Sequence, residues 1–123
     1  MGKSVFINCS NHPSANWPDC QKQAAKEYGE IIDIPFPNVG YDLTNDKLDN
    51  LVEETANIII KHKPKAVMCM GEFVCCFRMV QKLKDNNITV VASKTARVCE
   101  EVVNEDGSTT KTSRFDFKGF REY

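Results

Sequence analysis

Two short polar segments of this sequence carry side chains that could bind a phosphodiester or transfer a proton. The first combines short hydrogen-bonding side chains with a histidine: Asn8, Ser10, Asn11, His12 and Ser14. The second places two cations beside two hydroxyls: Ser93, Lys94, Thr95 and Arg97. Ammonium, guanidinium and hydroxyl groups suit phosphate oxygens. An imidazole can accept or donate a proton near neutral pH, so His12 is the candidate general acid or base.

A third candidate is the turn at residues 70–72. Gly71 would let a ligand approach the backbone, and the helix start that follows offers free N–H groups to an anion. Glu72 can cap that helix or meet a ligand hydroxyl. A structural explanation is open for all three segments, because loop side chains can satisfy their own backbone, a glycine can simply turn the chain, and cations can face solvent.

Several kinds of site have no support in the sequence. It contains no Gly-x-Gly-x-x-Gly, no Gly-x-x-x-x-Gly-Lys and no Gly-x-Ser-x-Gly, so a dinucleotide, P-loop or serine-hydrolase site is not expected. The acidic residues Asp19, Asp33 and Glu72 are scattered, and the six cysteines form neither a Cys-x-x-Cys pair nor a zinc pattern. We therefore expect no metal and no cofactor.

Hydrophobic patterning predicts alternating strands and helices up to about residue 92. We expect strands at residues 4–8, 30–34, 66–70 and 88–92, and helices at 17–28, 45–63 and 73–86. Asn16 and Thr44 are the expected N-caps of the first two helices. Residues 93–97 are expected to form a loop.

Beyond that loop, alternating side chains predict a hairpin of residues 98–103 and 109–117 around the turn at 105–108. Phe120 is out of phase with Phe115 and Phe117, so Gly119 is expected to mark a β-bulge.

This order of elements predicts one three-layer α/β domain over residues 1–123. Right-handed crossovers favour a parallel sheet in the order 2-1-3-4, with the C-terminal hairpin at one edge. Ligands of such sheets bind beyond the carboxyl ends of the strands, where the strand order reverses. Here the reversal lies between strands 1 and 3, so the three polar segments should meet there.

Composition places further limits on partners. The chain has 123 residues, of which 41% are hydrophobic and 27% charged, and its net charge is −1, so a protein that coats duplex nucleic acid is not expected. The longest apolar runs are far shorter than a membrane span, and the first residues show no secretory leader. We expect a cytoplasmic protein with reduced, mostly buried cysteines.

Four segments together resemble a known family. Residues 5–14 with Trp17, residues 34–39, residues 70–73 and residues 114–123 are similar to small CRISPR-associated proteins of type III systems, the standalone relatives of the CARF domains that sense cyclic oligoadenylate. The resemblance covers nearly the whole chain. It implies a Rossmann-like fold, a homodimer, and a cyclic oligoadenylate bound across the dimer axis.

The resemblance also implies an activity, since several such proteins are ring nucleases that linearise the messenger and switch off the antiviral response. Sensing domains often carry an acid-x-Ser/Thr-x-x-x-basic motif after strand 4. Here Ser93 replaces the acid, Thr95 matches, and Arg97 comes two residues early, which leaves the role of Arg97 open.

The expected function is therefore binding, with metal-independent cleavage, of a cyclic oligoadenylate such as the tetra-adenylate. His12, Lys94 and Arg97 are the candidate catalytic residues. The candidate ligand-binding residues are Asn8, Ser10, Asn11, Ser14, Gly71, Glu72, Ser93 and Thr95. Two alternatives stay open: a sensor or sponge that binds the messenger without turnover, and a Rossmann-like nucleotide or sugar-phosphate binder unrelated to defence.

Overall fold

The computed structural model describes residues 4–123 and contains a five-stranded sheet with helices on both faces. The strands are β1(Val5–Cys9), β2(Glu30–Asp33), β3(Ala66–Cys69), β4(Thr89–Val103) and β5(Thr109–Glu122), and the helices are α1(Asp19–Lys26), α2(Asn45–Lys61) and α3(Phe73–Asp85). A short 3₁₀ turn, η1(Ser14–Asn16), precedes α1.

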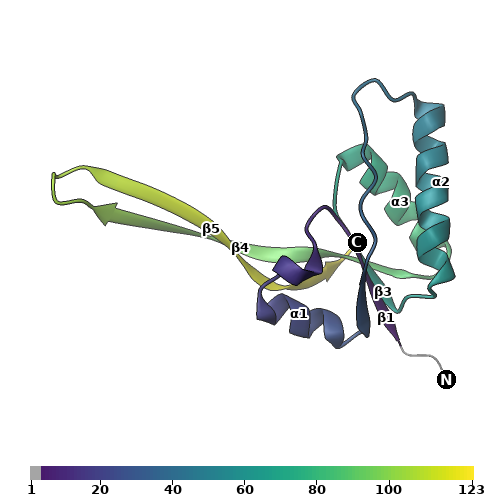
Figure 1. Ribbon diagram of the computed structural model, residues 1–123, viewed down its shortest axis with the longest axis horizontal. Coiled ribbons are helices and arrows are strands. Elements are labelled where there is room, and N and C mark those ends of the chain that lie inside the picture. Colours follow the sequence, from purple (N-terminus) through teal and green to yellow (C-terminus); the bar gives the residue numbers. More distant parts are fainter. Residues whose placement is uncertain (1–3) are drawn as a thin grey trace.

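The strand order is β2-β1-β3-β4-β5, in which the first four strands are parallel and β5 is antiparallel to β4. The four parallel strands have the predicted order 2-1-3-4, and the whole order is compatible with a Rossmann-like fold. Figure 1 shows α1 on one face of the sheet, with α2 and α3 on the other. The order reverses between β1 and β3, as the sequence predicted.

Each face of the sheet buries its own hydrophobic cluster. On the α1 side, Phe6, Met68 and Val91 of the sheet pack with Trp17 and Ala25. On the α2 and α3 side, a larger cluster includes Ile7, Val67 and Val90 of the sheet. Consecutive residues of a strand point to opposite faces, so Val90 and Val91 fix which side of β4 each later residue occupies.

The first helix starts later than the sequence predicted. We expected α1 to begin at Trp17 with Asn16 as its cap, but the N-cap is Pro18 and the first helical residue is Asp19. Trp17 precedes a proline and is extended, with ψ of 149°, since the proline ring disfavours helical backbone in the residue before it. The Thr44 cap is confirmed, as its side chain accepts a hydrogen bond from the Lys47 N–H.

The largest correction concerns residues 93–97, which are not a loop. They continue β4 without a break, and each pairs with a residue of β5. The register shifts between Lys94 and Thr95, where Gly119 has a φ of +126°, so the predicted bulge is confirmed. The hairpin is thus the outer half of β4 and β5 rather than a separate unit.

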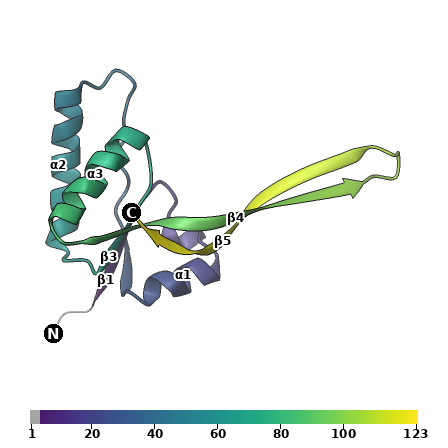
Figure 2. The same cartoon turned by 180° about the vertical axis from the view of Figure 1, so that it is seen from behind.

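The outer parts of the two long strands, residues 95–103 and 109–117 with their connecting turn, project away from the helices as a two-stranded arm (Figures 1 and 2). Most of these residues are exposed. In the part of the chain from residue 4 onward, no helix has both the length and the apolar character needed to cross a membrane.

Candidate functional site

The loop after β1 is held by its own side chains. Asn8 is only 1% exposed, and its Nδ2 donates to the His12 carbonyl at 2.9 Å and to Asp33 Oδ1 at 3.1 Å. The buried Ser10 hydroxyl donates to Asn8 Oδ1 at 2.7 Å. Because their polar atoms are already paired, Asn8 and Ser10 shape the loop rather than offer free groups to a ligand.

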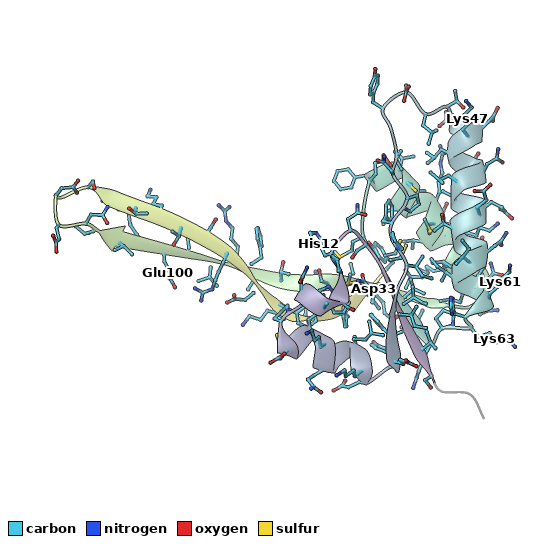
Figure 3. The ribbon with its side chains drawn as sticks, viewed as in Figure 1. His12, Asp33, Lys47, Lys61, Lys63 and Glu100 are labelled. Atoms are coloured by element: carbon cyan, nitrogen blue, oxygen red, sulfur yellow. The ribbon has the colours of Figure 1, made fainter. Side chains whose placement is uncertain are left out.

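Asp33 at the end of β2 is a positioning residue that the sequence analysis missed. Its Oδ1 accepts from Asn8, and its Oδ2 accepts from the Ser14 backbone N–H at 3.1 Å, so one carboxylate links both ends of the loop. Figure 3 labels both Asp33 and His12. Asn8 and Asp33 are register partners in the neighbouring strands β1 and β2. The predicted strand order already made these two strands neighbours, which could have pointed to Asp33.

Hydrogen bonds hold the backbone of His12, while no hydrogen bond to its side chain is found among residues 4–123. Its carbonyl accepts hydrogen bonds from Asn8 and from Trp17 Nε1 at 3.1 Å, while the residue itself is exposed. It lines a pocket of about 280 Å³ on the α1 side, which we call the switch-point pocket. The other walls of this pocket include Asn16, Trp17, Gln21, Met70 and Ser93.

Ser93 brings β4 into the same pocket. Its backbone N–H and hydroxyl contact the Met70 sulfur at 3.4 and 3.2 Å, which joins β4 to the end of β3. His12 and Ser93 are far apart in the sequence, but both line the same pocket at the reversal of strand order. Asn11 lines a smaller hollow of about 190 Å³ with Asn8 and Asp33.

The other candidates on β4 divide between its two faces. Ser93, Thr95 and Arg97 follow Val91 at alternate positions and lie on the α1 face. Lys94 lies on the opposite face of β4, the face of Val90, and its side chain runs close to Gly119. The structure thus separates Lys94 from His12, which the expected loop would not have done.

The turn after β3 serves packing and capping. A Cβ on Gly71 would overlap the ring of Phe36, so the space that we expected to admit a ligand is filled by this ring. The Glu72 carboxylate accepts a hydrogen bond from the Cys75 N–H at 2.7 Å and caps α3. Of the two alternatives for Glu72, the structure shows the helix cap.

An apolar pocket of about 620 Å³ lies on the α3 side of Met70, and the sequence analysis did not single it out. Its walls include Gly71, Phe73, Cys76, Phe77 and Tyr123. The Tyr123 hydroxyl donates to the Cys69 carbonyl at 2.6 Å and lies 3.6 Å from Cys76 Sγ. Tyr123 follows β5, which is separated from β3 by β4 in the sheet. No local sequence pattern therefore indicated its contact with Cys69.

Cys76 in the wall of this pocket and the neighbouring Cys69 differ from ordinary cysteines in their pKa values. The Cys76 and Cys69 sulfurs are 3.8 Å apart. Hydrogen bonding with Cys69, assisted by the Tyr123 hydroxyl and the Gly71 N–H, lowers the pKa of Cys76 to about 6 against the effect of burial. The same hydrogen bond raises the pKa of Cys69. All six cysteines are free; Cys20 and Cys99 are exposed and the other four are buried.

Among residues 4–123, no three His, Cys, Asp or Glu side chains are grouped as ligands for a metal ion.

Residues 4–121 match the model of a protein family described as "Uncharacterized protein MJ1673 family". The comparison with curated proteins gave no match.

Proposed function

Since the chain belongs to the uncharacterized MJ1673 family, whose description assigns no activity, we propose from its site that it binds a cyclic oligoadenylate as a homodimer and linearises it. The observation that carries the proposal is the shared pocket of His12 and Ser93 at the reversal of strand order, where nucleotide ligands of α/β sheets bind. The α1 face of the sheet thus carries the exposed His12 imidazole, the Ser93 hydroxyl and the Arg97 guanidinium.

The size of the pocket supports a dimer. Its volume of about 280 Å³ lies near the lower limit of pockets for small organic ligands, about 300–1,000 Å³, so it cannot hold a ring of four nucleotides. A twofold-symmetric dimer would present two such pockets to a ring that has its own twofold axis. Each protomer would then contribute one His12 and one Arg97.

The chemistry requires little of the protein. A ribose 2′-hydroxyl attacks the adjacent phosphorus and the 5′-oxygen leaves, which produces a 2′,3′-cyclic phosphate and a 5′-hydroxyl. His12 would accept the proton of the 2′-hydroxyl or return one to the leaving oxygen. Arg97, four residues beyond Ser93 on the same face of β4, would neutralise a neighbouring phosphate and hold the ring in place. Because RNA carries its own nucleophile, the proposed reaction uses no metal.

The test is incubation of the purified protein with cyclic tri-, tetra- and hexa-adenylate in EDTA, followed by chromatography of the products and sedimentation with and without ligand. We expect a dimer that binds one of these rings and releases a linear product with a 2′,3′-cyclic phosphate. Binding without product would instead identify a sensor or sponge. No binding of any ring would overturn the proposal, and cleavage that requires added Mg²⁺ or Mn²⁺ would overturn the mechanism.

Arg97 and Lys94 offer a matched pair within one strand for locating the ligand. Arg97→Ala should weaken affinity about tenfold or more, because a charged hydrogen bond to phosphate contributes about 1.5–3 kcal/mol. Lys94→Ala, on the opposite face of β4, should change affinity less, and Lys47→Ala on α2 should not change it (Figure 3 labels Lys47). Equal losses for all three variants would place the ligand elsewhere.

A further inference from the structure

We propose that the arm carries a nucleotide subsite, in which a nucleobase stacks on Phe115 while the adjoining phosphate meets Arg97. The identity of the nucleotide, an adenylate, rests on the proposed function. The subsite itself rests on how the register of β4 and β5 arranges aromatic and polar residues on one face of the arm.

The register places an aromatic ring beside each candidate residue of the α1 face. Residues directly opposite in an antiparallel pair share a face, and the pairs here are Ser93 with Phe120, Thr95 with Phe117, and Arg97 with Phe115. The bulge at Gly119 produces this order, because it returns Phe117 and Phe120 to the same side.

The three rings form a row that begins in the core at Phe120, continues with Phe117 and ends in solvent at Phe115. The Phe120 centroid lies 5.2 Å from that of Phe6 in the core, and Phe117 makes an edge-on contact with Phe120 at 5.1 Å. Phe115 is the outermost ring and is 69% exposed. A large apolar ring at that exposure, on the same face as a guanidinium, offers a surface on which a base can stack.

The charges of the arm also differ between its two faces. On the face opposite α1, Arg114 pairs with Glu100 at 2.9 Å and with Asp116 at 3.1 Å, so its cation is neutralised. On the α1 face, Arg97 takes part in no ion pair among residues 4–123, and Lys111 lies across from Glu101. The free guanidinium therefore lies on the aromatic side, where it complements a phosphate.

A hollow of about 500 Å³ is lined in part by Arg97, the register partner of Phe115. Its other walls on the α1 face are Cys99, Glu101, Lys111 and Ser113, and Glu100 and Thr112 line it from the opposite face. Glu101 lies across from Lys111, so Arg97 is the cation of this hollow that has no carboxylate as its register partner. Ser93 and Arg97 are four residues apart along β4, about 13 Å at the usual strand rise of about 3.3 Å per residue. One nucleotide in the switch-point pocket and another on Phe115 would thus belong to one oligonucleotide.

The experiment measures equilibrium binding of radiolabelled cyclic tetra-adenylate and of linear tetra-adenylate at two salt concentrations. Phe115→Ala should weaken binding about 5- to 100-fold, and Phe115→Trp, which keeps a stacking surface, should restore it. Val102→Ala, an exposed apolar residue on the other face of the arm, should leave affinity unchanged. Arg97→Ala should also reduce the slope of log affinity against log salt by about 0.7, the loss of one phosphate contact.

The outcomes separate this inference from the proposed function. Tight ring binding that is equal in wild type, Phe115→Ala and Phe115→Trp would overturn the arm subsite and leave the proposed function intact. Binding of the linear form alone, lost in Phe115→Ala, would support the subsite and reject a ring as the ligand. Wild type that binds neither form would reject both. Conversion of a dimer to a monomer by Phe115→Ala in sedimentation would show that a second copy covers the ring and would overturn the subsite.

Discussion

The indole Nε1 of Trp17 donates a hydrogen bond to the backbone carbonyl of His12 across 3.1 Å. Trp17 is buried in the α1-side cluster, whereas the His12 side chain is exposed in the switch-point pocket. The core thus fixes the backbone of the candidate proton-transfer residue and leaves its imidazole free. The same carbonyl accepts from Asn8, so His12 is positioned from two sides.

His12→Ala should slow single-turnover cleavage of the ring by about 10²–10⁴-fold, the usual contribution of a positioned acid or base. Ligand affinity should change far less, because an imidazole supplies one hydrogen bond. His62→Ala, at the C-cap of α2, is the matched control and should leave the rate unchanged. A loss of only a few fold in His12→Ala would mean that alignment of the 2′-hydroxyl, rather than proton transfer, sets the rate.

Asn8→Ala should lower the free energy of unfolding by about 1–3 kcal/mol, because it leaves buried hydrogen-bonding partners unpaired. Its side chain joins the His12 carbonyl, Asp33 and Ser10. Urea denaturation measures the change. Asn57→Ala, an exposed substitution on α2, should have little effect. Equal midpoints for the two variants would show that these hydrogen bonds contribute nothing net to stability.

Gly71→Ala should destabilise the protein by about 1–3 kcal/mol, because the new methyl group overlaps the Phe36 ring. The cost should shrink in the background of Phe36→Ala, where the ring is absent, and a double-mutant cycle by thermal unfolding measures that coupling. Gly40→Ala, which would meet only the flexible Asp42 side chain, is the control. Additive effects of the Gly71 and Phe36 substitutions would contradict this account.

Cys76 should react with iodoacetamide before Cys75, although the two are adjacent in α3. Hydrogen bonding lowers the pKa of Cys76 to about 6, so its thiolate predominates at neutral pH and is lost as the pH falls through that value. Burial raises the pKa of Cys75 to about 11, so that thiol stays protonated. Only Cys76 also lines the apolar pocket.

Peptide mapping by mass spectrometry at pH 5–8 tests this order in a Cys20→Ser/Cys99→Ser background, which removes the exposed thiols. The Cys76 rate should level off above about pH 7. A Cys76 rate that keeps rising tenfold per pH unit up to pH 8, or faster labelling of Cys75, would contradict the assigned hydrogen bonds.

The sequence by itself determined the order of the elements and several of their ends. Continuous apolar runs identified the buried strands, and the 3.6-residue period identified α2 and α3, because both patterns are local consequences of which side chains must leave water. Thr44 was recognisable as a cap from its place before α2, whereas for Glu72 the sequence left a cap of α3 and a ligand contact open. The phase change between Phe117 and Phe120 located the bulge. These features together gave the correct strand order.

Only the tertiary structure decided which of the candidate residues share a site. The sequence of residues 93–97 resembles a loop because β4 leaves the core there and its side chains are exposed or half-buried, so polarity no longer distinguishes a strand from a turn. Once β5 pairs with them, alternation separates Lys94 from Arg97 and sets Phe115 beside the latter. Asp33 accepts a hydrogen bond from Asn8, which lies 25 residues earlier in the sequence. The ring of Phe36 packs against Gly71, which is also distant in the sequence. Such contacts follow from the packing of the whole chain, and no local pattern carries them.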